Sequence, residues 1–206
     1  IPRGGEFDLV LADGTQVWLN AESRLRYPVE FSGKERKVVL EGEAYFQVKK
    51  NPSLPFRVEI RNQVIEVLGT EFNVSGYKDE VHVYTTLVNG KVKVATTGRD
   101  MTLLPGEQCV LDTGDGSMIR QQADVDKIIS WKKGKFILEE QTLEQIMQKL
   151  ARWYDITVFY QNPALKNKVF KGSVPRYAEL QQVLNILEKT GEVQFHIQNR
   201  TVIVKE

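Results

Sequence analysis

Glycine-centred phrases punctuate the first half of the chain, at Gly42–Phe46, Val67–Val74 and Leu104–Glu107. Each lies in a run of short segments in which apolar and polar residues alternate, the pattern of half-buried β-strands. None of the three contains a cluster of reactive side chains. The pattern therefore predicts β architecture and directs the search for function toward binding rather than catalysis.

Residues 7 to about 120 are predicted to be nearly all β. Asp13-Gly14 and Asn89-Gly90 are strong tight-turn signals, because Gly accepts the positive φ of such turns. A faint repeat links Gly42, Gly69 and Gly90, since each is followed by apolar residues at alternate positions. This region is expected to be either a β-solenoid-like stack or a β-sandwich.

The pattern becomes helical in the second half. Thr142 and Gln145 match a capping box, and apolar residues then recur at helical spacing up to Tyr154. A second amphipathic helix begins near Leu180 and stops before Gly191. The apolar positions of the two helices lie 37 residues apart, as do those of the strands that follow them, so a β-α-β unit occurs twice. We predict an all-β domain at 1–123 and a small two-helix α/β domain at 124–206.

Composition narrows the function classes. The 206 residues carry a net charge of +1, which argues against a dedicated nucleic-acid binder. Residues 1–125 hold 15 Lys and Arg against 18 Asp and Glu, whereas residues 126–206 hold 13 against 9. The second domain is therefore mildly basic, and we interpret Lys132, Lys133 and Lys135 as part of a solvated linker rather than a phosphate site.

The single cysteine, Cys109, rules out an internal disulfide and is expected in the core. No apolar run approaches the roughly 18–20 residues of a membrane span. The chain opens at Ile1 without an initiator Met, which leaves open a membrane anchor in a longer parent protein.

No catalytic, metal or cofactor site is expected. His82 and His196 fall in different domains and lack ligands at metal spacing. Glu41 and Glu43 share a strand face, but nothing nearby orients them for acid/base work. No nucleophile elbow, Walker loop or dinucleotide fingerprint is present. We therefore predict a non-enzymatic protein.

An alternative from another class is a glycan-binding β module with an α/β appendage. Aromatic residues are frequent in the β region, and sugar platforms are aromatic. The alternative requires Trp18, Tyr45 and Tyr84 to form a flat exposed row.

Four phrases in order resemble the FecR family of anti-sigma factors: Leu11–Asn20, Gly42–Val48, Leu68–Val74 and Leu104–Glu107. Trp131 and Leu150–Tyr154 are similar to the small C-terminal domain that follows FecR in proteins of Bacteroidetes type. The resemblance assigns structural roles to the matching motif positions, which are Asp13, Gly14, Trp18, Asn20, Gly42, Tyr45, Phe46, Gly69, Thr70, Phe72, Asn73, Pro105, Gly106, Trp131, Trp153 and Tyr154.

The resemblance also implies a function. Family members have a cytoplasmic segment that holds an extracytoplasmic-function sigma factor, a transmembrane helix and a periplasmic sensor region, and this chain resembles the periplasmic region only. Such a region is expected to be tethered to the inner membrane and to receive a signal from the N-terminal signalling domain of a TonB-dependent outer-membrane transporter. Leu180–Val204 is itself similar to those signalling (STN-like) domains.

Two related α/β modules can pair by sheet extension, in which an edge strand of one adds to the sheet of the other. The terminal strand, comprising Thr201, Val202, Ile203 and Val204, is the predicted edge for this contact. Ile186 falls off the apolar face of its helix and is the predicted exposed apolar contact.

Overall fold

The computed structural model describes residues 1–206 and divides into an N-terminal unit, Ile1–Ile129, and a C-terminal unit, Ser130–Glu206. The sequence placed the boundary six residues earlier, at 123/124. Helix α1 (Val125–Ile128) falls in the N-terminal unit because it packs on strand β8 (His82–Asn89). Each unit has its own buried apolar core.

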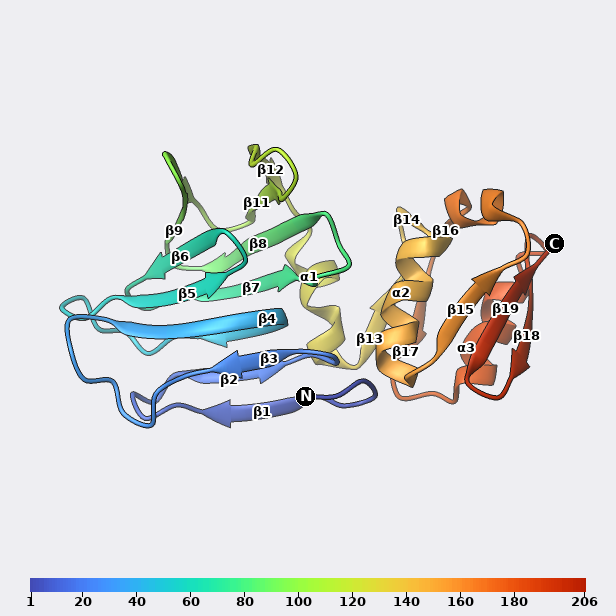
Figure 1. Ribbon diagram of the computed structural model, residues 1–206, viewed down its shortest axis with the longest axis horizontal. Coiled ribbons are helices and arrows are strands. Elements are labelled where there is room, and N and C mark those ends of the chain that lie inside the picture. The colour runs from blue at the N-terminus through green and yellow to red at the C-terminus, as the bar shows by residue number, and fades with distance from the viewer. The chain divides into compact units, whose positions relative to one another are not determined.

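The N-terminal unit is one 12-stranded sheet that bends around a common core like a nearly closed barrel (Figure 1). Its other strands are β1 (Phe7–Val10), β2 (Gln16–Leu19), β3 (Arg24–Arg26), β4 (Arg36–Gln47), β5 (Phe56–Ile60), β6 (Gln63–Val67), β7 (Glu71–Gly76), β9 (Val92–Thr96), β10 (Arg99–Leu103), β11 (Glu107–Asp112) and β12 (Met118–Gln122). The all-β prediction is confirmed.

Strand β4 joins the two halves of this sheet. Its first residues pair with β3 and β5, and its last residues pair with β2 and β7. After β4 the strands alternate in pairs between the halves: β5 and β6 in one, β7 and β8 in the other, then β9 and β10, then β11 and β12. The two predicted forms were a β-solenoid-like stack and a β-sandwich, and the structure is neither, because β4 is long enough to join both halves into one nearly closed barrel-like sheet.

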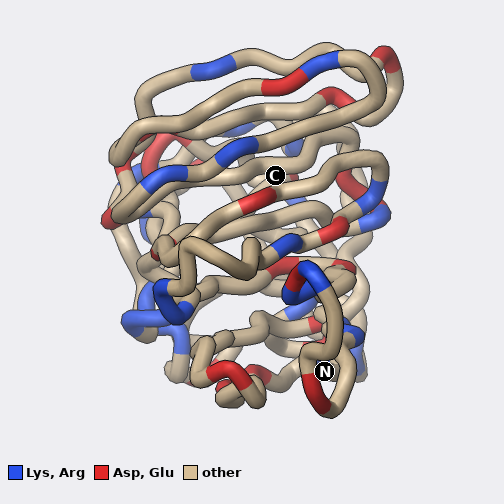
Figure 2. Tube along the Cα trace, turned by 90° about the vertical axis from the view of Figure 1, so that its left-hand side faces the viewer, with Lys and Arg blue, Asp and Glu red and all other residues tan.

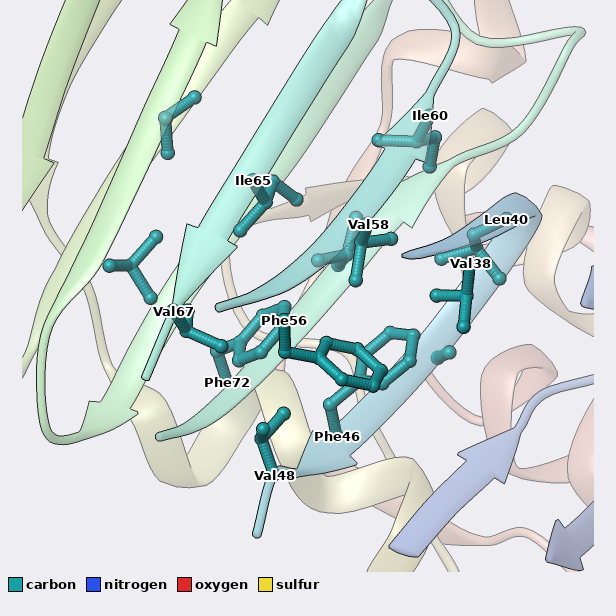
Figure 3. Close-up of a cluster of buried hydrophobic side chains, with 14 of the residues drawn as sticks. Val38, Leu40, Phe46, Val48, Phe56, Val58, Ile60, Ile65, Val67 and Phe72 are labelled. Carbon is teal, nitrogen blue, oxygen red and sulfur yellow. The ribbon is translucent and has the colours of Figure 1, made fainter. Parts of the chain in front are cut away.

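Alternation along the strands places every second side chain in the core. Phe46 and Phe72 face each other across β4 and β7, with ring centroids 5.1 Å apart in a stacked arrangement (Figure 3). Both are fully buried, and aromatic pairs of this kind contribute about 0.5–1.5 kcal/mol beyond area burial. Cys109 lies in the same core, as predicted.

The C-terminal unit is α/β and follows the predicted order of two β-α-β units. Its helices are α2 (Leu143–Tyr154) and α3 (Leu180–Glu188), with 3₁₀ turns at η1 (Ile129–Lys133) and η2 (Pro163–Asn167). With α1, the region predicted to hold two helices holds three. Its strands are β13 (Lys135–Ile137), β14 (Gln141–Thr142), β15 (Thr157–Tyr160), β16 (Val169–Phe170), β17 (Ser173–Pro175), β18 (Gln194–Gln198) and β19 (Thr201–Lys205).

The predicted capping box begins α2. The Thr142 hydroxyl accepts the Gln145 N–H at 3.3 Å, and the Gln145 side chain accepts the Thr142 N–H at 2.9 Å. Helix α3 ends at Glu188, and Gly191 adopts the positive φ expected of a residue that follows a helix. The first strands of the two repeats, β13 and β17, pair with each other, whereas the second strands, β15 and β18, flank β19.

Candidate interaction surface

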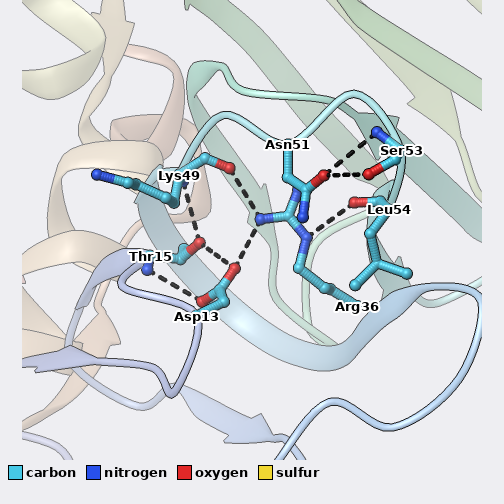
Figure 4. A network of polar contacts seen from close by, with 7 residues as sticks. All are labelled: Asp13, Thr15, Arg36, Lys49, Asn51, Ser53 and Leu54. Atoms are coloured by element: carbon cyan, nitrogen blue, oxygen red, sulfur yellow. Dashed lines mark hydrogen bonds and ion pairs between the residues drawn. The ribbon is translucent and has the colours of Figure 1, made fainter.

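The motif residues of the N-terminal unit build its framework. Asp13 and Gly14 form a tight turn in which the Asp13 carboxylate accepts the Thr15 N–H at 3.0 Å and the Thr15 hydroxyl at 2.7 Å (Figure 4). The guanidinium of Arg36 donates to Asp13 Oδ2 at 2.7 Å and to the carbonyls of Lys49 and Leu54. These contacts tie three separate chain segments together around one buried charge.

Gly42 marks the point at which β4 passes from one half of the sheet to the other. Its φ of +92° lies in the left-handed region, and a Cβ there would come within 2.4 Å of the Ser23 hydroxyl oxygen. That hydroxyl accepts the N–H of Glu43 at 2.8 Å. Only glycine fits this close approach.

A second glycine site lies where Gly69, Thr70 and Gly90 come together. Thr70 Oγ1 donates to Lys91 O at 2.9 Å and accepts the Lys91 N–H at 3.5 Å, and the Thr70 carbonyl accepts the Val48 N–H at 2.9 Å. A Cβ on Gly90 would lie 3.0 Å from Thr70 Oγ1, and one on Gly69 would lie 2.6 Å from Lys50 Cα. The repeated glycines therefore allow neighbouring segments of the chain to pack closely, and this requirement explains the glycine repeat in the sequence.

Asn20 and Asn73 both donate to the Glu43 carboxylate, at 2.7 and 3.0 Å. The other carboxylate considered in the sequence, Glu41, pairs with Lys78 and Arg26, and its hydrogen bond from Lys78 lowers its pKa. Glu43 thus serves as an acceptor between strands rather than as half of an acid/base pair. Pro105 and Gly106 form the turn before β11, where Gly106 N donates to Leu87 O at 3.0 Å.

The aromatic residues do not form a sugar platform. Tyr45 is only 4% exposed, packs edge-on against Trp18 at 5.6 Å, and donates its hydroxyl to Glu71 at 2.8 Å. Burial is the main cause that raises the pKa of Tyr45, and the nearby Glu71 carboxylate raises it further. Trp18 and Tyr84 are half-buried. No flat exposed row exists, so the glycan-binding alternative loses the feature on which it depended.

Charges on the outside of the sheet are matched. Across β4, β5 and β6, Lys37 pairs with Glu59, and Arg57 pairs with Glu35 and Glu66. Positive and negative residues are interspersed along the chain in Figure 2. No group of three or more His, Cys, Asp or Glu residues is arranged to hold a metal ion.

In the C-terminal unit the motif aromatics surround a buried arginine, which the sequence analysis missed. The Arg176 guanidinium lies 3.9 Å from the Trp153 ring centroid, 5.3 Å from that of Phe136 and 5.7 Å from that of Trp131. Arg176 is 1% exposed. Tyr154 closes the cluster by donating its hydroxyl to Ala178 O at 2.6 Å.

The predicted edge strand is not at an edge. β19 lies in the centre of its three-stranded sheet, parallel to β15 and antiparallel to β18. Its main-chain groups are used on both sides, so Thr201–Val204 cannot receive a partner strand. Val202 and Val204 are fully buried in the core, whereas Thr201 and Ile203 point to the opposite, outer face.

The outer face of this sheet is partly apolar. Phe159 of β15 is 58% exposed and lies in register with Ile203 of β19, which in turn lies in register with exposed His196 of β18. The opposite face packs with α2 and α3 in the core of the unit. Ile186 on α3 is 40% exposed, as predicted. The open edges of the sheet are β15 and β18.

Comparisons with known proteins agree along the chain. Residues 1–93 match the family described as FecR protein, and residues 135–204 match the family described as FecR, C-terminal. Two crystal structures of a candidate anti-sigma factor from Parabacteroides distasonis are similar to the chain. One is 27% identical with a TM-score of 0.91, covering 100% of this chain and 97% of the other. The second is 28% identical with a TM-score of 0.90, covering 100% and 96%. No curated protein matches the chain in sequence.

Proposed function

Because the chain belongs to the FecR family of anti-sigma factors and is not an enzyme, we propose that it is the periplasmic signal-receiving region of a transmembrane anti-sigma factor. In this proposal it binds the N-terminal signalling domain of a TonB-dependent outer-membrane transporter. The sigma factor is bound on the cytoplasmic side of the inner membrane, by the cytoplasmic segment that characterises the family. No helix of the structure is long and apolar enough to cross a membrane.

The observation that carries the proposal is the C-terminal α/β unit with its partly apolar outer sheet face. Two helices pack on one face of the β15-β19-β18 sheet, while Phe159 and Ile203 lie on the other. The sequence of this unit resembles the transporter signalling domains themselves. Two α/β modules of one kind can associate through such faces and edges, using main-chain hydrogen bonds and alternate side chains.

Signalling then requires a difference in contact. A transporter changes the state of the anti-sigma factor only if its signalling domain binds differently when the transporter is loaded, because a ligand shifts an equilibrium only by its differential affinity. The chain contributes the binding surface to this mechanism. The transporter contributes the change in availability of its domain.

Calorimetric titration of the 206-residue chain with the signalling domain of the transporter encoded beside it tests the proposal. We expect saturable binding, and a signalling domain from an unrelated transporter is the matched control. Deleting Thr201–Glu206 is not a suitable variant, because it would remove the central strand of the sheet and its buried Val202 and Val204. Absence of binding to the neighbouring domain, with both proteins folded, would count against the proposed function.

A further inference from the structure

We infer that β15 (Thr157–Tyr160) is the edge to which an extended strand of the partner adds. The inference rests on the proposed function, because it takes the transporter signalling domain as the partner. The assignment to β15 replaces the predicted contact through Thr201–Val204, because that strand, β19, occupies the centre of the sheet.

The backbone of β15 presents unused groups at this edge. Thr157 N donates to Arg200 O at 2.8 Å, and Gln161 N donates to Val204 O at 3.0 Å, so the amides at odd positions point toward β19. In a parallel pair, successive residues direct their N–H and C=O groups to opposite sides. The amides of Val158 and Tyr160 therefore point outward, where an added strand would pair with them.

The other edge, β18, is partly blocked. It joins β19 through the two-residue turn Asn199-Arg200, so Gln198 and Thr201 form the first hydrogen-bonded pair of the hairpin. Phe195 and Ile197 lie at the alternate positions, and their amides therefore point away from β19. The Glu188 carboxylate from α3 accepts the Phe195 N–H at 2.6 Å. An added strand at β18 would have to displace this charge-assisted hydrogen bond, and β15 has no such barrier in its outward amides.

Side chains beside β15 suit a partner strand. Exposed Phe159 and its neighbour Ile203 provide apolar contact on the outer face. A second copy of this chain is a poorer occupant, because pairing through β15 would bring together two C-terminal units that each carry 12 Lys and Arg against 8 Asp and Glu. The transporter signalling domain is the occupant that the proposed function supplies, and an edge strand with apolar side chains would pack against Phe159 and Ile203.

Amide hydrogen exchange of the full chain, with and without the transporter signalling domain, tests the inference directly. We expect the amides of Val158 and Tyr160 to exchange rapidly in the free chain and to become protected on binding. The amide of Ile197 should change little. Protection at Ile197 instead, or saturable binding with no protection at Val158 and Tyr160, would overturn the assignment to β15.

A pair of proline variants gives an independent readout. Val158 and Ile197 are both half-buried and β-branched, each lies one residue from an end of an edge strand, and both have outward amides, so each tolerates the loss of its N–H to a similar degree. Val158→Pro should weaken binding by roughly tenfold or more, whereas Ile197→Pro should preserve it. Circular dichroism and thermal melting identify a variant that fails to fold, and the exchange experiment on the unaltered chain then decides.

The outcomes separate the two proposals. If the unaltered chain does not bind the signalling domain, the proposed function fails and the edge assignment fails with it. If it binds and Val158→Pro binds equally well, only the edge assignment fails. Concentration-dependent self-association that is lost in Val158→Pro, without binding to the signalling domain, would identify a second copy as the occupant and overturn the inference as stated.

Discussion

Arg36 Nη1 lies 2.7 Å from Asp13 Oδ2, and the Arg36 side chain is only 1% exposed. The pair connects the turn after β1 to the beginning of β4. Nη1 also donates to the Lys49 carbonyl and Nε to the Leu54 carbonyl, whereas the buried Nη2 has no hydrogen-bond partner. A buried guanidinium needs such partners, because an uncompensated charge in the interior is costly. Asp13, a motif residue of the first turn, thus stabilises the fold by pairing with an arginine that lies 23 residues further along the chain.

Asp13→Ala should destabilise the N-terminal unit by about 3–5 kcal/mol, because it leaves the buried Arg36 charge without its carboxylate. Denaturant unfolding followed by circular dichroism measures the loss. The matched control is Glu59→Ala, which breaks the exposed pair with Lys37 and should cost about 1 kcal/mol or less. Equal losses in the two variants would show that the Arg36 site contributes no more than a surface ion pair.

Gly42→Ala should destabilise the protein much more than Gly14→Ala, although both glycines have similar positive φ. The backbone strain is common to both and is about 1 kcal/mol. At Gly42 the new Cβ also meets Ser23 Oγ at 2.4 Å and Ser23 Cα at 2.8 Å, whereas nothing lies within 4 Å at Gly14. Thermal melting of the two variants separates steric exclusion from strain, and indistinguishable melting temperatures would contradict the close-approach role of Gly42.

Local signals in the sequence predicted the elements that are stabilised locally. The capping box at Thr142 and Gln145 fixes the start of α2, and Gly191 follows the end of α3. The outward position of Ile186 followed from helical spacing alone. In each case the interactions that determine the structure join residues only a few positions apart, so the local sequence pattern is enough to predict it.

What the sequence missed depends on contacts between distant segments. The connection from β15 through α3 places β18 at the far edge of the sheet, and the hairpin turn Asn199-Arg200 then returns β19 into the space between them. No pattern within Thr201–Val204 reveals this position. Arg36 and Arg176 are buried although arginine normally lies at the surface. Their partners are 23 residues away at Asp13 for Arg36 and 23 residues away at Trp153 for Arg176, so residue type alone gives the wrong expectation.

Arg176→Ala should destabilise the C-terminal unit by about 2–4 kcal/mol, because it removes cation–π contacts and leaves a cavity among Trp131, Phe136 and Trp153. Arg176→Lys keeps the charge but loses the planar stacking on Trp153, so an intermediate loss is expected. Tryptophan fluorescence during denaturant unfolding reports on this cluster through Trp131 and Trp153, and the signal of Trp18 in the N-terminal unit is common to all variants. A lysine variant as unstable as the alanine variant would mean that shape rather than charge determines the contribution of Arg176.

The Cys109 thiol should make the stability of the N-terminal unit fall at alkaline pH. Burial raises the pKa of this thiol from 9.0 to about 11. In the unfolded chain the thiol ionises at its ordinary pKa, so the unfolded state loses its proton first as the pH rises. The contribution of the neutral thiol is therefore complete below pH 9 and is lost as the pH rises from about 9 through about 11.

Denaturant unfolding between pH 8 and about 11 measures this dependence, and Cys109→Ala is the control because tyrosines exposed by unfolding also ionise near pH 10. The difference between the two proteins should change with pH in the stated direction. The native thiol should also resist an aromatic disulfide reagent at pH 8 and react once the chain is unfolded, since reaction requires an accessible thiolate. Rapid labelling of the folded protein would contradict the burial of Cys109.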